Sequence, residues 1–176
     1  MRKWSHLVEG FRSGDRVLGL NGWQDYSLSG GTGVTLLDPS MLHPSWTLRK
    51  LGMPGFTAWA GLIQIGMPKP SERICVAAAT GLLGATVKQI ARLMGCHVVG
   101  IAGGADKGAY AVASLGSDAC IDHKCNDFAA ELLAAAPKRI DVYFENLGGV
   151  VLDAVLPLGN TGAGMGGHQS PRLPTS

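Results

Sequence analysis

The chain lacks the residue patterns that mark several common catalytic classes. Its 176 residues contain no Gly-x-Ser-x-Gly motif, which marks the nucleophilic serine of α/β-hydrolases. The phosphate-binding loop of nucleoside triphosphatases has a lysine directly after its last glycine, and no lysine follows Gly84 in this way. None of the tyrosines Tyr26, Tyr110 and Tyr143 has a lysine four residues later, which argues against the short-chain dehydrogenase arrangement. The sequence therefore nominates no nucleophile and no general acid, and the catalytic residues are unknown at this stage.

An excess of one charge and closely paired cysteines are also missing. The 15 basic and 13 acidic residues leave a net charge of +2, and the basic residues are scattered, which argues against a nucleic-acid partner. The cysteines Cys75, Cys96, Cys120 and Cys125 include no Cys-x-x-Cys pair, and the five histidines are dispersed. Buried, reduced thiols are therefore expected rather than a metal site, and the cytoplasm is the expected compartment.

One stretch has the length and the lack of charge of a membrane span. Residues 51–68 carry no charged side chain, but Pro54, Gln64 and four glycines interrupt them, which favours a buried core helix with flanking turns. The first dozen residues have no apolar core of the signal-peptide kind. The sequence predicts neither a membrane partner nor a signal peptide.

The first part of the chain has a different sequence pattern from the rest. Short strand-like runs at 16–20, 23–28 and 34–37, separated by glycine turns, predict part of a small β domain. A helix-containing connection follows. Residues 1–65 are therefore assigned to a partial β domain and its connecting helix.

Residues 66–158 alternate between strand and helix patterns, which predicts an α/β fold with a parallel sheet. The expected strands are 73–79, 97–102, 119–121 and 140–144. The expected helices are 82–95, 105–115, 126–136 and a short one after Gly149. The natural strand order for such a unit is 3-2-1-4. Residues 159–176 show no further strand-like run, and we expect a disordered or aberrant tail there.

The junction between the first of these strands and its helix is the strongest functional signal. The run Ala-Ala-Thr-Gly-Leu-Leu-Gly begins at Ala78, where the usual dinucleotide fingerprint has a glycine. Gly81 would let a pyrophosphate approach the backbone, and Gly84 would let the helix pack closely on the sheet. The amides of Leu82, Leu83 and Gly84 would face the anion at the helix start. The alternative interpretation is a tight strand–helix turn without a ligand.

The end of the second expected strand indicates which nicotinamide cofactor would bind. Sites for NAD carry a carboxylate there, which holds the ribose hydroxyls. Small residues, Gly103 among them, replace it here, and Asp106 comes one residue past the contact point. Lys107 follows at the helix start, where it could meet a 2′-phosphate. NADP(H) is therefore the expected cofactor, with an ordinary solvated lysine as the alternative for Lys107.

A further polar residue follows the fourth expected strand. Asn146 comes at the carboxyl edge of the sheet, where ligands bind in open α/β folds. Its side chain could hydrogen-bond the ribose or the nicotinamide. A capping role is the alternative.

Seven segments together resemble the zinc-independent medium-chain dehydrogenases/reductases of the prostaglandin reductase, leukotriene hydroxydehydrogenase and curcumin reductase type. The segments lie within about residues 10–158, and they are 14–19, 22–26, 51–59, 78–84, 95–104, 121–124 and 141–149. The resemblance implies part of a GroES-like substrate domain before a partial Rossmann fold. It also implies NADPH-dependent reduction of the activated C=C bond of enals and enones, small molecules, and suggests a homodimer for full-length members. A quinone reductase of the same superfamily and a non-catalytic NADP-binding remnant are the alternatives.

The same resemblance implies roles for single residues. Gly81–Gly84 would hold the pyrophosphate, Lys107 the 2′-phosphate, and Asn146 matches a cofactor-contacting asparagine. His123 stands where the family has tyrosine, and it could still hydrogen-bond or stack near the 2′-phosphate. Lys88 replaces a glycine at the edge of the helix's apolar stripe, where it would snorkel or loosen the packing. Because family members extend beyond both ends, the resemblance implies an incomplete chain without the substrate-polarising tyrosine.

Overall fold

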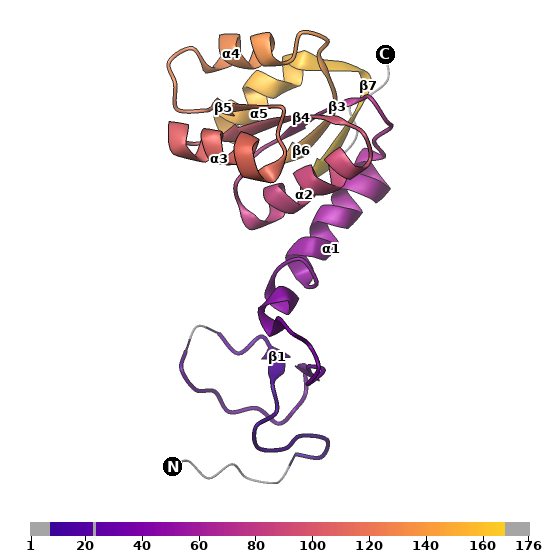
Figure 1. The fold of residues 1–176 in the computed structure, drawn as a ribbon, viewed down its shortest axis with the longest axis vertical. Coiled ribbons are helices and arrows are strands. Elements are labelled where there is room, and N and C mark those ends of the chain that lie inside the picture. The colour runs from indigo at the N-terminus through magenta and orange to yellow at the C-terminus, as the bar shows by residue number, and fades with distance from the viewer. Residues whose placement is uncertain (1–7, 23, 168–176) are drawn as a thin grey trace. The chain divides into compact units, whose positions relative to one another are not determined.

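The structure, a computed structural model, describes residues 8–22 and 24–167 and divides the chain into two compact units. The first unit ends at Leu48 and the second begins at Arg49. The sequence patterns placed the domain boundary at residue 65, and the boundary between the two units falls earlier. The connecting helix accounts for the difference, because α1 (Met53–Trp59) packs on α2 (Leu82–Leu93) of the second unit (Figure 1).

In its described residues, 8–22 and 24–48, the first unit contains two short strands and one 3₁₀ helix. Strands β1 (Val17–Gly19) and β2 (Val34–Leu36) pair antiparallel, and η1 spans Pro44–Leu48. The strand expected at 23–28 is wrong for residues 24–28, which are all exposed and form no strand, and Trp23 lies outside the described residues. This segment is mostly polar and buries no face, so it gains little from strand pairing, which explains the difference. The GroES-like assignment of this unit stays a prediction.

The second unit is built on a five-stranded parallel sheet in the order β5-β4-β3-β6-β7. Its strands are β3 (Arg73–Val76), β4 (His97–Ala102), β5 (Ala119–Asp122), β6 (Ile140–Glu145) and β7 (Gly159–Gly167). Counted along this unit, the order is 3-2-1-4-5. The expected order 3-2-1-4 is therefore confirmed, and one more strand is added at the edge.

Strand β7 corrects the expectation of a disordered or aberrant tail from residue 159 onward. It pairs with β6, with Met165 opposite Tyr143. Five of its nine residues are glycine, so the apolar alternation that usually marks a strand is missing. The glycines are needed for packing, since a Cβ at Gly164 would lie 2.8 Å from the carbonyl oxygen of Gly66. Residues 168–176 lie outside the described part.

Two apolar cores form, one on each face of the sheet, because successive strand residues point to opposite faces. Ile74 and Val76 of β3 pack with the face that α1 and α2 cover, whereas Cys75 packs with α4 (Phe128–Ala135) and α5 (Gly149–Val155). Figure 1 shows these two layers. The remaining elements of the unit are η2 (Ala60–Gly66), α3 (Ala105–Leu115) and η3 (Leu156–Leu158).

The helix expected within 51–68 is confirmed. Helix α1 continues into the π-helical turns of η2, and Ala58 and Leu62 are fully buried. Within residues 8–22 and 24–167, no helix is both long and apolar enough to span a bilayer. The cytoplasmic location stays a prediction.

Candidate functional site

A cavity of about 570 Å³ lies beside the carboxyl ends of β3, β4, β5 and β6, where ligands bind in open α/β sheets. Its lining comes from the turns and loops that follow these strands and from the first turns of α3. The lining residues are Ala78, Thr80, Gly81, Ala102, Gly103, Lys107, Tyr110, His123, Lys124 and Leu147. The fold thus brings together four residues that the sequence nominated, namely Gly81, Gly103, Lys107 and His123.

The turn between β3 and α2 leaves backbone donors unpaired at the helix start. Ala78 adopts a left-handed conformation with φ of 48°, and the amide of Gly81 donates to its carbonyl at 2.9 Å. Gly81 begins the helix without a side-chain cap. The amides of Leu82, Leu83 and Gly84 occupy the first helical turn, where no intrahelical acceptor exists. Together with the helix dipole, they form an arrangement that suits an anion, and their contact with a pyrophosphate stays a prediction.

The two glycines of this turn are needed for different reasons. At Gly84 a Cβ would lie 3.0 Å from the carbonyl carbon of Ala78 and would collide with its oxygen, so packing requires a glycine there. At Gly81 a Cβ would meet that oxygen at 3.2 Å and otherwise little. Gly81 is exposed and lines the cavity. Its lack of a side chain is therefore better explained by the approach of a ligand than by packing.

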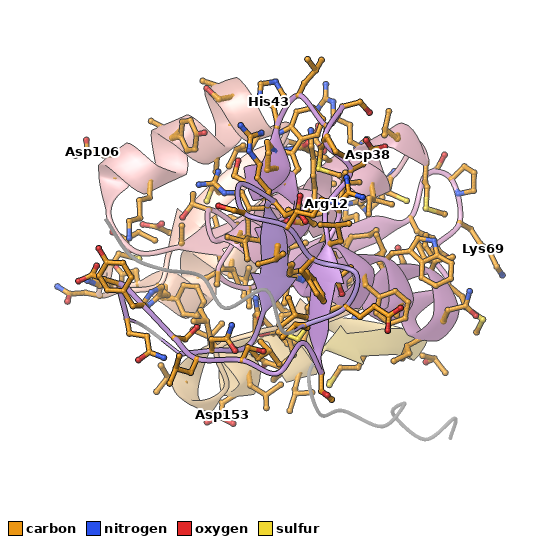
Figure 2. The ribbon with its side chains drawn as sticks, turned by 90° about the horizontal axis from the view of Figure 1, so that it is seen from below. Arg12, Asp38, His43, Lys69, Asp106 and Asp153 are labelled. Atoms are coloured by element: carbon orange, nitrogen blue, oxygen red, sulfur yellow. The ribbon has the colours of Figure 1, made fainter. Side chains whose placement is uncertain are left out.

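The loop after β4, where NAD sites carry a carboxylate, is lined by basic side chains here. A Cβ at Gly103 would lie 3.0 Å from Nε2 of His123 and 3.1 Å from Cε of Lys124. Both side chains therefore lie against this glycine of the loop. Asp106, the nearest acidic residue in sequence, is exposed near the beginning of α3 (Figure 2) and does not line the cavity.

Asp122 ties together the two loops that carry these basic groups. Strand pairing sets Asp122 of β5 opposite Ala102 of β4. The amide of Lys124 donates to Oδ1 of Asp122 at 2.9 Å. Hydrogen bonds from the backbone amides of Gly104 and Lys124 lower the pKa of Asp122 below its ordinary value. The carboxylate is thus engaged by the protein backbone and fixes both loops at the edge of the cavity.

Glu145 organises the loop after β6 in a similar way. Its Oε2 accepts the hydroxyl of Tyr143 at 2.8 Å, and its Oε1 accepts the amides of Leu147 and Gly148. Burial, followed by the hydrogen bond to Glu145, raises the pKa of Tyr143 well above its ordinary value. Asn146 follows Glu145 at this edge but is not among the residues that line the cavity. Its contact with a cofactor stays a prediction.

Sequence reasoning missed Tyr110 and Lys124 as lining residues. Tyr110 comes three residues after Lys107, so one helical turn places both on the same side of α3. The three-residue spacing could therefore have identified Tyr110 as a further candidate site residue. Lys124 directly follows His123, but its position over Gly103 depends on how the turn after β5 folds, and no local pattern reports this.

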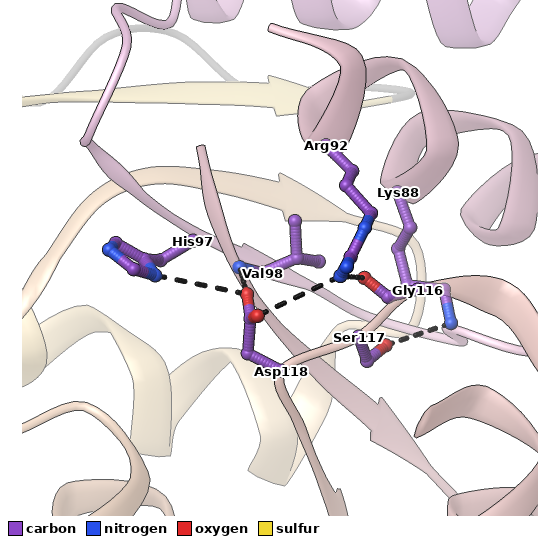
Figure 3. A network of polar contacts seen from close by, with 7 residues as sticks. All are labelled: Lys88, Arg92, His97, Val98, Gly116, Ser117 and Asp118. Atoms are coloured by element: carbon purple, nitrogen blue, oxygen red, sulfur yellow. Dashed lines mark hydrogen bonds and ion pairs between the residues drawn. The ribbon is translucent and has the colours of Figure 1, made fainter. Parts of the chain in front are cut away.

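Lys88 lies inside the second unit rather than at its edge (Figure 3). Its side chain is fully buried, and Nζ donates to Oγ of Ser117 at 2.9 Å. Burial lowers the pKa of Lys88 to about 8. Of the two expected alternatives, snorkelling to the surface is therefore wrong, and looser packing stays untested. The buried amine joins α2 to the segment before β5.

The neighbouring polar groups form an exposed network around Asp118 (Figure 3). Asp118 accepts the amide of Val98 at 2.7 Å and forms an ion pair with Arg92 at 3.8 Å, and Nδ1 of His97 lies 4.0 Å from its carboxylate. Surface ion pairs of this length contribute little to stability. The network is a support for β4 rather than part of the cavity.

Metal ligands do not gather in residues 8–22 and 24–167, where no three His, Cys, Asp or Glu side chains are placed to hold an ion. The four cysteines are free thiols, and Cys75 and Cys96 are buried. Burial raises the pKa of both thiols above the ordinary value. This environment suits unreactive core residues.

Known proteins are similar to this chain in both sequence and fold. Residues 83–165 match the family model described as zinc-binding dehydrogenase. An NADPH-dependent curcumin reductase of Escherichia coli (strain K12) is 57% identical over 153 residues, which are 87% of this chain and 44% of that protein. A 2-alkenal reductase (NADP(+)-dependent) of Nicotiana tabacum is 40% identical over 148 residues, which are 83% of this chain and 43% of that protein.

A solved structure agrees over most of the chain. CurA from Vibrio vulnificus in complex with NADPH is 51% identical with a TM-score of 0.83, over 88% of this chain and 46% of that one. The chain thus spans less than half the length of the relatives it matches. This combined likeness of sequence and fold supports the resemblance to the zinc-independent medium-chain dehydrogenases/reductases.

Proposed function

We propose that this chain binds NADP(H) at the carboxyl edge of its sheet and serves NADPH-dependent reduction of the activated C=C bond of enones and enals. One observation carries the proposal. The loop after β4, where NAD sites hold a carboxylate, has only small residues before Asp106, and His123 and Lys124 lie against its Gly103. Lys107 lines the same cavity. Relatives named as curcumin and 2-alkenal reductases support the substrate class.

Each part of the site suits one part of the dinucleotide. The uncapped first turn of α2 would hold the pyrophosphate through backbone amides. Lys107 would neutralise a 2′-phosphate, and the exposed ring of Tyr110 offers a face near the adenosine. Leu147, fixed through Glu145, would border the far side. When bound, NADPH supplies the hydride that is added to the β-carbon of the substrate, and no described residue is assigned as donor of the α-carbon proton.

Oxidation of NADPH by the intact chain with a simple enone tests the proposed reaction. The loss of absorbance at 340 nm is followed with 1-octen-3-one, and a benzoquinone serves as the comparison acceptor. Faster turnover of the enone is the expected result. Turnover of the quinone alone would assign a quinone reductase. Tight binding of NADPH without turnover of either acceptor would restrict the function to nucleotide binding.

Lys107→Met is expected to weaken NADPH binding about tenfold and to leave NADH binding unchanged. The loss of one charge-assisted contact to the phosphate is worth about 1.5 kcal/mol or more. Isothermal titration of both nucleotides measures the effect. Lys138→Met removes an exposed lysine outside the cavity and is the matched control. An equal loss for NADH and NADPH would contradict the role given to Lys107.

A further inference from the structure

Two lysines reach the cavity from different elements. Lys107 projects from the first turn of α3, and Lys124 from the turn after β5. The ten described residues that line the cavity include these two lysines and His123 but no aspartate or glutamate. Three carboxylates lie near the lining without belonging to it: Asp106 is exposed, Asp122 accepts backbone amides, and Glu145 accepts Tyr143 and the amides of Leu147 and Gly148. The cavity is therefore cationic at this end.

The side chain of Lys124 lies directly over the loop that would bind the ribose. Its Cε is 3.1 Å from the point where a Cβ of residue 103 would stand. In NAD sites a carboxylate near the end of this strand holds the ribose hydroxyls, so the ribose would lie beside this loop. A group attached to the 2′-oxygen would therefore come within reach of the ammonium one bond beyond Cε. His123 Nε2 lies on the same side, 3.0 Å from that point.

We propose that Lys124 is a specificity-determining residue, which with Lys107 holds the phosphate monoester on the 2′-oxygen of the adenosine ribose. This inference rests on the proposed function, because it presumes that the cavity takes the adenosine end of NADP(H). A phosphate monoester carries a charge between −1.5 and −2 at neutral pH. Two ammonium groups from separate elements match that charge better than Lys107 alone. An adenosine ribose without the phosphate gives Lys124 nothing to neutralise.

Asp122 acts as a positioning residue for this pair. Its carboxylate accepts the amides of Gly104, just before the helix that carries Lys107, and of Lys124 itself. The two backbone hydrogen bonds are the largest interactions of this carboxylate, and weaker attractions to His123 and Lys124 follow them. The geometry between the two lysines therefore depends on Asp122 without any contact of Asp122 with the ligand.

Titration with adenosine bisphosphates tests the role of Lys124 without any catalytic step. The intact chain, Lys124→Met and the control Lys138→Met are each titrated with 2′,5′-ADP, 3′,5′-ADP and ADP by calorimetry. The intact chain should prefer 2′,5′-ADP over the other two. Lys124→Met should weaken 2′,5′-ADP about tenfold with ADP unchanged, whereas Lys124→Arg should retain most of the affinity and Lys138→Met all of it.

The outcomes separate this inference from the proposed function. If the intact chain prefers 2′,5′-ADP and Lys107→Met abolishes the preference while Lys124→Met leaves it intact, the role of Lys124 is refuted and the proposed function survives. If the intact chain shows no preference for 2′,5′-ADP, both are refuted. A preference for 3′,5′-ADP would overturn the assignment of the phosphate to the 2′-oxygen.

Discussion

Gly84→Ala is expected to destabilise the second unit by about 3 kcal/mol, the largest effect among the substitutions considered for this chain. The added methyl group would collide with the carbonyl oxygen of Ala78 and lie 3.1 Å from Cα of Ala79. Both neighbours are backbone atoms of the β3–α2 turn, so no side chain can move aside. Helix α2 would have to shift away from the sheet. Urea unfolding followed by circular dichroism measures the loss.

Gly81→Ala is the matched control for this prediction. Its methyl group would meet the same oxygen at 3.2 Å, which a small adjustment can relieve. We expect a change in unfolding free energy below about 1 kcal/mol and a clear loss of nucleotide affinity, because the methyl group would stand above the helix start. Equal stability of Gly84→Ala and Gly81→Ala would refute the distinction between a packing glycine and a ligand-facing glycine.

Lys88→Met is expected to stabilise the protein by about 2 kcal/mol at pH 7. Burial lowers the pKa of Lys88 from its ordinary value of 10.5 to about 8, which corresponds to a cost of ~3 kcal/mol for keeping the amine charged. The hydrogen bond to Ser117 offsets about 1 kcal/mol of that cost and is lost with the amine. Methionine fills a similar volume without a charge. Chemical denaturation of both proteins measures the difference.

The pH dependence of this difference follows from the lowered pKa. Below pH 8 the amine is charged in both the folded and the unfolded chain, and the folded state bears the full cost. Between about pH 8 and 10.5 the folded chain loses the proton first, so the cost disappears as the pH rises. The advantage of Lys88→Met should therefore shrink from pH 7 to pH 10, while the exposed Lys138→Met shows no such trend. A Lys88→Met protein less stable than the parent at pH 7 would contradict the account.

The parts of the fold with a regular hydrophobic pattern could be predicted from the sequence. Strands β3, β4, β5 and β6 are apolar runs bounded by glycines or polar residues, and the structure confirms them within a few residues. The expected strand 73–79 ends at Val76, because Ala78 already adopts a left-handed turn conformation. The turn between β3 and α2 could be recognised as a candidate phosphate site because its glycines stand between a strand and a helix.

Other parts depend on contacts between distant residues, and local patterns could not report them. Strand β7 is rich in glycine because it packs on the backbone of η2, a partner about a hundred residues earlier in the chain. Lys88 reads as a polar residue at the edge of an apolar stripe, yet Ser117 gives its amine a buried partner. Lys124 enters the site only because Asp122 fixes the turn after β5. These three features could be identified only from the tertiary structure.

Calorimetric titration of the intact chain with NADPH and with NADH tests the central claim most directly. The claim is that the glycine loop after β4, with Lys107 and Lys124 over it, selects the 2′-phosphate. We expect NADPH to bind at least about tenfold more tightly than NADH, which equals about 1.4 kcal/mol. Equal affinities for the two nucleotides, or a preference for NADH, would contradict it.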